Sequence, residues 1–211
     1  MTTRIAVVSA GLSQPSSTRL LADRLAAATA GDLRAKGAEV EVDFVDLRDH
    51  ARDLADNLLT GFPAPTLRSA IDKVVTADGL IAVTPIFSAS YSGLFKTFFD
   101  VLEPDSLAGM PVLTGATGGT ERHSLALEHA VRPLFAYLRS IVVPTAVYAA
   151  STDWGANSAD QALNNRIDRA AKEFAGLLLG TRASRPADPY AEMSSFEDLL
   201  AANRPSETES V

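Results

Sequence analysis

The chain has 211 residues, no cysteine and three histidines, and 26 acidic against 19 basic residues give it a net charge of −7. This composition excludes a disulfide scaffold, a thiolate nucleophile and a cysteine-ligated metal, and it argues against nucleic acid as the main partner. The histidine spacing offers no catalytic metal site, and no apolar run is long enough to span a membrane. No secretory leader is recognisable at the first residues, so we expect a cytoplasmic protein.

Strand-like and helix-like segments alternate along the chain. Short runs rich in branched apolar residues predict strands at 4–9, 38–45, 79–84, 111–114 and 141–149. Helical spacing of apolar residues predicts helices at 17–30, 66–76, 92–103, 121–139 and 157–179. This alternation is typical of an α/β fold with a doubly wound parallel sheet and right-handed crossovers.

The last part of the chain differs in composition from the rest. Residues 1–182 are interpreted as one α/β domain, because a chain of this length buries enough surface for a single core. Residues 183–211 carry three prolines, six acids and two arginines, and we expect them to form an acidic tail. Within the tail, SSFEDLL at 194–200 combines capping-box spacing with one apolar helical face. The tail is therefore either frayed or carries a short helix that docks on this subunit or a neighbour.

The loop SAGLSQPSSTR at 9–19 joins the first strand to the first helix. In a doubly wound sheet, ligands bind beyond the carboxyl ends of the strands, where the strand order reverses. Gly11 lets the backbone approach a ligand closely, and the SST run at 16–18 places three hydroxyls at a helix N-terminus, which favours an anion. A single serine cap explains one of these hydroxyls and not all three. Because neither GxxxxGK[ST] nor GxGxxG is present, we expect one phosphate monoester here.

The loop after the third strand, TPIFSASYSGLFKTFFD at 84–100, carries apolar residues where solvent would otherwise lie. We expect Pro85 to preset a turn, and Ile86 and Phe87 to contact one edge of a flat heterocycle. The phenylalanines at 95, 98 and 99 are interpreted as core or subunit-interface residues. Lys96 taken alone is interpreted as a surface residue.

The loop after the fourth strand, GATGGTERH at 115–123, is rich in glycine. Gly118 and Gly119, flanked by threonines, let bare backbone lie against a planar ring. Without the other two loops, an ordinary flexible loop would be the preferred interpretation. His123 is equally a contact to a flavin or its reductant, or a capping or solvent-facing residue, and His129 is interpreted as structural.

A cradle for one phosphate, an apolar wall and a glycine-rich loop together describe a site for FMN. At these segments the chain resembles the NAD(P)H-dependent FMN reductase family, most closely its branch that supplies reduced flavin to two-component monooxygenases. The likeness spans about residues 4–180, and its matching stretches are PSSTRLLADRL (15–25), TPIFSASYSGLFK (84–96), ATGGTERHSLALEHAVRPLF (116–135) and VVPTAVYA (142–149). It implies a flavodoxin-like sheet of five parallel strands in the order 2-1-3-4-5.

The resemblance also implies where the flavin lies. Its phosphate is expected at residues 11–18, and its ring against 85–88 and 117–119. In the common family form, the phosphate loop has Gly-Ser followed by Arg, whereas here Ala10 and Gly11 precede Ser13, which removes a guanidinium from the phosphate. The cofactor-binding residues expected in full are Ser9, Gly11, Leu12, Ser16, Ser17, Thr18, Pro85, Ile86, Phe87, Ser88, Thr117, Gly118 and Gly119.

The chemistry implied by the resemblance is hydride transfer from NADPH or NADH to N5 of the flavin. Stacking of the two substrates carries such a reaction, so no catalytic side chain and no metal is expected. The resemblance further implies a homodimer or homotetramer and a flavin-dependent monooxygenase as partner. Two alternatives stay open, namely an FMN-bound quinone, azo or chromate reductase, and a non-enzymatic flavodoxin-like electron carrier.

The helix expected at 121–139 contains Pro133 deep inside a strongly helical run. Proline cannot donate a hydrogen bond to the carbonyl four residues earlier, and its ring crowds that carbonyl. We therefore predict a distortion between Glu128 and Pro133, with one wide π-turn as a common solution. The family resemblance places this segment in a subunit interface.

Overall fold

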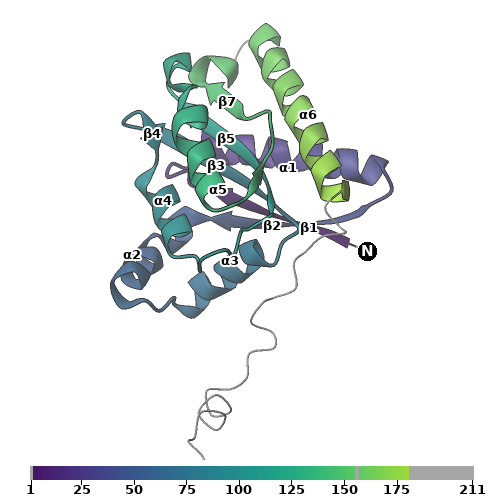
Figure 1. The fold of residues 1–211 in the computed structure, drawn as a ribbon. Coiled ribbons are helices and arrows are strands. Elements are labelled where there is room, and N and C mark those ends of the chain that lie inside the picture. Colours follow the sequence, from purple (N-terminus) through teal and green to yellow (C-terminus); the bar gives the residue numbers. More distant parts are fainter. Residues whose placement is uncertain (1, 155–156, 181–211) are drawn as a thin grey trace, which may run out of the picture. The chain divides into compact units, whose positions relative to one another are not determined.

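The computed structural model describes residues 2–154 and 157–180, without the side chains of 157–159 (Figure 1). Its parallel sheet has the order β2-β1-β3-β5-β6, and β7 also pairs with β5 in parallel. The strands are β1 (Thr2–Ser9), β2 (Glu39–Asp46), β3 (Gly79–Phe87), β5 (Pro111–Gly118), β6 (Ile141–Val142) and β7 (Val147–Ala150). This confirms the predicted order 2-1-3-4-5, with the fifth strand divided in two. The predicted tail and its helix lie outside the described residues.

Two layers of helices cover the sheet (Figure 1). Ile5 and Val7 of β1 belong to an apolar cluster with α1 and α6, whereas Ala6 and Val8 belong to a second cluster with the remaining helices. This alternation is the period of two that a strand buried on both faces requires. The helices are α1 (Ser17–Ala35), α2 (Ala51–Thr60), α3 (Pro65–Val75), α4 (Gly93–Asp100), α5 (Arg132–Tyr137) and α6 (Asn157–Gly180). None of the described helices is long and apolar enough to cross a membrane.

The segment between β2 and α3 is helical, which the sequence did not predict. It forms a 3-10 turn (Leu47–His50) that leads into α2, and α2 ends at Gly61 in a left-handed conformation with φ 78°. Only Leu54 and Asn57 of α2 are buried. The sequence of α2 is nonetheless amphipathic, so it carried a helical pattern that the prediction overlooked.

β3 continues beyond Pro85 as far as Phe87, so the expectation that Pro85 presets a turn is wrong. Pro85 pairs in register with Thr117 of β5, and Phe87 pairs with the short antiparallel strand β4 (Ser90–Tyr91). Ser88 and Ala89 form the connection, with φ values of 45° and 66°. The turn therefore follows the proline by three residues, and two residues with positive φ make it, as in tight β-hairpins.

The expected single helix at 121–139 is divided into three pieces. A 3-10 turn (Glu121–His123) is followed by a π-helix (Leu127–Val131), and α5 begins at Arg132. The amide of Arg132 donates to the carbonyl of Leu127, five residues earlier, and Pro133 takes the second position of α5. The predicted π-turn before Pro133 is therefore confirmed, and the wide turn ends just before the proline, which cannot donate the next helical hydrogen bond.

The fifth strand is interrupted between β6 and β7, around Pro144. Arg132 donates from Nη1 to the carbonyl of Val143 at 3.2 Å and from Nη2 to that of Pro144 at 3.0 Å. The amide of Thr145 donates to Glu173 Oε2 at 2.8 Å. Side chains therefore satisfy the backbone groups that a continuous strand would have paired, and the break is stable without further ladder bonds.

Candidate functional site

The three predicted ligand loops meet at one edge of the sheet. β1, β3 and β5 are parallel neighbours that end at Ser9, Phe87 and Gly118. The amide of Ala10 donates to the carbonyl of Val83 at 3.0 Å, which fixes the exit of the first loop against β3. The carboxyl ends of these strands therefore bring together segments up to 109 residues apart, as the doubly wound architecture predicts.

A glycine of the first loop packs against the residue that caps α1. Ser16 is the N-cap of α1, and its hydroxyl accepts a hydrogen bond from the amide of Arg19 at 3.2 Å. A Cβ at position 11 would lie 2.0 Å from that hydroxyl oxygen, so any other residue there would force the cap hydroxyl to move. Ser9 is buried beneath the loop, whereas Leu12 and Ser17 are exposed on it. The loop thus presents backbone and small polar groups at its surface.

The first turn of α1 has the features of an anion site. No acidic residue lies in it, and in the described structure the amides of Ser17 and Thr18 donate to no protein acceptor. Such amides, with the helix dipole, favour a phosphate. The hydroxyl of Thr18 is buried 2.8 Å from that of Thr117 at the end of β5. The amide of Thr18 therefore has no protein acceptor in the described structure, while its side chain ties the first loop to the third segment.

The second segment divides into a buried and an exposed part. Pro85 and Ile86 are buried, whereas Phe87 is 47% exposed and Ser88 is exposed. The buried hydroxyl of Thr84 donates to the carbonyl of Pro85 at 2.9 Å and accepts from the amide of Ser92 at 3.1 Å. This hydroxyl holds the hairpin against the start of α4. The apolar wall that faces solvent is consequently Phe87 rather than Ile86.

The third segment is shaped by a tyrosine that the sequence interpretation missed. Tyr148 Oη donates to the carbonyl of Thr120 at 2.7 Å, and a Cβ at position 118 would lie 2.1 Å from that oxygen. Gly119 is exposed, and a Cβ at position 119 would meet nothing within 4 Å. Burial, with a smaller effect from the charge of Asp153, raises the pKa of Tyr148, so it stays a donor at neutral pH. Only the place of Tyr148 on a predicted strand pointed towards it.

A charged cluster beside the first loop was also missed. Arg19 Nε donates to Asp23 at 2.8 Å and Nη1 donates to Asp46, and its guanidinium lies 4.2 Å from the centroid of Phe44. Burial lowers the pKa of Arg19, but the two carboxylates outweigh this effect and raise it above its ordinary value. The only arginine in the first turn of α1 is therefore engaged by protein carboxylates.

The remaining interpreted residues lie away from this edge or on its surface. The phenylalanines at 95, 98 and 99 are core residues packed edge-on against one another. Lys96 pairs with Asp100 at 2.5 Å, and His123 and His129 are exposed. The aromatic residues thus anchor α4, and the surface interpretation of Lys96 is confirmed.

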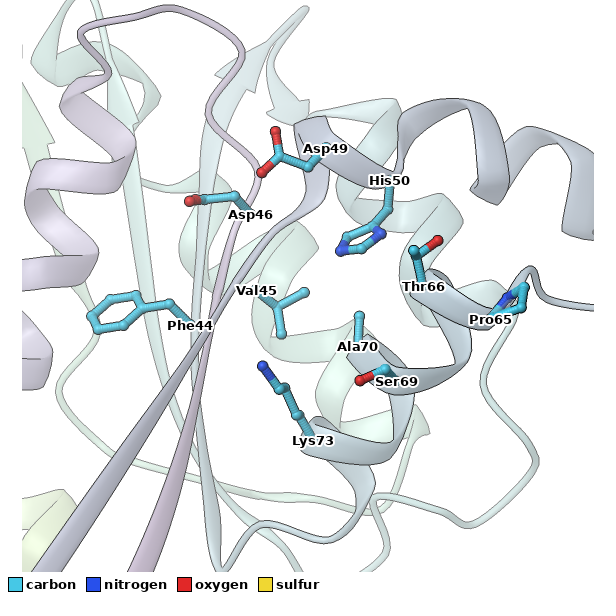
Figure 2. A pocket seen from close by; sticks show the side chains of 10 residues that line it. All are labelled: Phe44, Val45, Asp46, Asp49, His50, Pro65, Thr66, Ser69, Ala70 and Lys73. Atoms are coloured by element: carbon cyan, nitrogen blue, oxygen red, sulfur yellow. The ribbon is translucent and has the colours of Figure 1, made fainter.

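A separate cavity of about 520 Å³ opens between β2 and α3 (Figure 2). Its walls include Asp46, Asp49, His50 and Lys73, and none of the predicted flavin residues lines it. His50 Nδ1 is buried there without a hydrogen-bond partner in the described structure. The cavity touches the predicted site only through Asp46, which pairs in register with Ser9.

Known proteins resemble this chain over most of its length. The family described as NADPH-dependent FMN reductase matches residues 3–155. An FMN reductase (NADPH) from Pseudomonas aeruginosa is 35% identical over 181 residues, which cover 85% of this chain and 94% of that protein. An NADH-dependent FMN reductase, SfnF, from Pseudomonas fluorescens is 35% identical over 179 residues, covering 84% and 92%.

Solved structures show the same relationship. An oxidoreductase from Corynebacterium diphtheriae superposes with a TM-score of 0.81 at 43% identity, covering 85% of this chain and 98% of that one. The resemblance inferred from the loops is confirmed, and with it the flavodoxin-like fold, the oxidoreductase class and the use of FMN with a nicotinamide nucleotide. The chain belongs to the NADPH-dependent FMN reductase family.

Proposed function

We propose that this protein reduces FMN with NADPH or NADH and releases FMNH₂ to a partner flavin-dependent monooxygenase. The observation that carries the proposal is the first turn of α1, where the amides of Ser17 and Thr18 have no protein acceptor in the described structure and no acidic residue lies within the turn. Phe87 and the Gly118–Gly119 backbone lie at the same strand edge. One phosphate monoester and one flat ring are the ligand parts that such an edge accommodates.

The residues of this chain act by positioning. The amides at the start of α1, with the hydroxyls of Ser16 and Ser17, hold the phosphate by charge-assisted hydrogen bonds. Ser9, Gly11 and Leu12 shape the cradle around it. Bound FMN supplies the hydride acceptor at N5, and no side chain needs to transfer a proton to that atom in the hydride step. The segments 85–88 and 117–119 hold one edge and face of the ring, which leaves the other face for nicotinamide.

Weak retention of the product follows from the charges around the cradle. The loop at 9–18 contains no lysine or arginine, and Arg19 is occupied by Asp23 and Asp46. Each charge-assisted hydrogen bond to the phosphate contributes about 1.5–3 kcal/mol, and no bidentate guanidinium adds to them. We therefore infer that FMN is exchanged as a substrate rather than kept as a prosthetic group.

Assembly and location complete the proposal. Leu125 precedes the π-helix and Tyr137 ends α5, and their exposed fractions of 62% and 85% support burial of this segment in a homodimer or homotetramer. We infer a cytoplasmic enzyme, because its reductant is a reduced nicotinamide nucleotide. Light scattering of the purified protein should give a dimeric or tetrameric mass. A monomeric mass, with the wild-type activity retained, would contradict the assembly.

The decisive experiment compares flavin and quinone as electron acceptors. Under NADH and NADPH, we expect fast turnover of free FMN, a dissociation constant measurable by flavin fluorescence, and loss of yellow colour on gel filtration. Tight, stoichiometric FMN with much faster quinone reduction would replace this proposal by the quinone reductase. A protein that binds FMN but oxidises neither nucleotide would instead be an electron carrier.

A further inference from the structure

Arg19 is a cation placed beside the phosphate cradle but turned to other partners. It is the third residue after the cap Ser16, so its amide already lies in the turn that would hold the phosphate. Its side chain instead reaches the carboxylates of Asp23, one turn later on α1, and Asp46, the last residue of β2. A guanidinium is the side chain best suited to bind phosphate with two parallel hydrogen bonds. Here that capacity is used within the protein.

The partners of Arg19 come from a strand edge adjacent to the cradle. Asp46 pairs in register with Ser9, the residue at which the first loop begins. Phe44 and Asp46 project from the same side of β2, towards α1, while Val45 projects to the opposite side, towards α3 (Figure 2). The Phe44 ring lies under the guanidinium at 4.2 Å. Two carboxylates and one ring therefore hold Arg19 in place from the β2 side of the cradle.

Stability alone is a weak reason for this arrangement. The side chains of Arg19 and Asp46 are 35% and 34% exposed, and pairs this accessible stabilise a fold only slightly. Their larger effect is on the field at the helix N-terminus. An arginine free to turn to the phosphate would add a bidentate contact, whereas an arginine neutralised by two carboxylates adds none.

We propose that Asp46, Asp23 and Phe44 restrain Arg19 away from the flavin phosphate and thereby set the low affinity that product release requires. These residues are specificity-determining for the phosphate monoester and do not touch the reacting atoms. The inference rests on the proposed function, since it assumes that the phosphate lies at the start of α1. It attributes the weak retention of FMN to Asp46, Asp23 and Phe44, which lie outside the loop at 9–18.

The test is the affinity of Asp46→Asn for two flavins, measured by fluorescence quenching. We expect the FMN dissociation constant to fall about tenfold, which corresponds to about 1.4 kcal/mol. Riboflavin, which lacks the phosphate, should bind as it does to the wild type. Asp32→Asn is the matched control, because Asp32 pairs with Lys36 on the same helix, about 20 Å along its axis from Arg19. It removes the same charge and should leave both affinities unchanged.

The same substitution in an Arg19→Gln variant shows whether the gain in FMN affinity comes from releasing Arg19 or only from removing the negative charge of Asp46. In Arg19→Gln, the further change Asp46→Asn should give no gain in FMN affinity, because no guanidinium remains to be freed. An equal gain in both backgrounds, an equal gain for riboflavin, or no gain at all would overturn the proposal. The readout is binding and not turnover. A wild type that binds FMN but fails to reduce it would refute the proposed function while leaving this test intact.

Discussion

Replacing Gly118 by alanine should disrupt the third flavin segment through a single clash. The new methyl carbon would lie 2.1 Å from Tyr148 Oη, more than 1 Å inside normal contact. Tyr148 is 9% exposed and its ring has little room to retreat, so either its hydroxyl leaves the carbonyl of Thr120 or the segment moves. The first outcome removes the hydrogen bond that holds the segment in place, and the second moves the backbone that is proposed to lie against the flavin ring.

The size of the effect follows from two contributions. Overpacking a well-filled site costs about 1–3 kcal/mol, and the lost hydrogen bond of Tyr148 adds about 0.5–1.5 kcal/mol. We expect the free energy of unfolding to fall by about 2–4 kcal/mol. For a domain of this size, that change lowers the melting temperature by roughly 5–15 °C. Urea unfolding and thermal melts of Gly118→Ala measure it directly, and flavin fluorescence should show weaker FMN binding.

Two further variants decide whether the clash is the cause. Gly119→Ala meets no atom within 4 Å and should unfold at nearly the wild-type temperature. Tyr148→Phe removes the clashing oxygen and leaves the nearest ring carbon 3.2 Å from the new methyl. In that background, Gly118→Ala should therefore cost less than about 1 kcal/mol, as coupling between contacting residues requires. Equal costs in both backgrounds would refute the reasoning.

Three other changes test the neighbouring features. Ser16→Ala with Thr18→Ala should raise the FMN dissociation constant severalfold or more, by removing the cap of α1 and the hydroxyl that ties it to Thr117; an unchanged constant, measured by fluorescence, would place the phosphate elsewhere. Ala89→Gly should raise the free energy of unfolding by up to about 1 kcal/mol in urea titrations, because φ at Ala89 is 66°; a destabilised variant would show that this turn is not strained. A hydrogen bond from Arg132 lowers the pKa of Glu128, so its stabilisation is present above about pH 4.3 and lost as the pH falls through the depressed pKa. Thermal melts between about pH 5 and pH 3 should consequently fall less steeply for Glu128→Gln than for the wild type; parallel curves would leave this carboxylate without a role.

Structural features that depend on one short segment could be predicted from the sequence. The helix cap at Ser16 and the π-turn before Pro133 are of this kind, because a hydroxyl before a helix and a proline within one have few structural solutions. The flavodoxin-like strand order followed from the alternation of elements and the family resemblance. Proline is unusual inside a strand, so Pro144 indicated that the fifth strand is interrupted. The single strand predicted at 141–149 did not take this into account.

Contacts between distant segments were not accessible in the same way. The serines and threonine at 16–18 look alike in the sequence, yet the Thr18 hydroxyl is buried against Thr117, which lies near the end of β5. The fit of Tyr148 against Gly118 and the engagement of Arg19 by Asp46 likewise depend on which strands become neighbours. Which polar group serves the ligand and which serves the fold is therefore decided by tertiary packing.

The interrupted fifth strand has a consequence for the behaviour of the protein at high concentration. Exposed sheet edges can pair with those of other copies and seed aggregation. Here one edge consists of β6, two residues long, and β7, four residues long, and the carbonyls of Val143 and Pro144 between them are already bonded to Arg132. The opposite edge, β2, carries Glu39, Glu41 and Asp43 at alternate positions. Short edge strands on one side and alternating carboxylates on the other thus disfavour the addition of a strand from another copy.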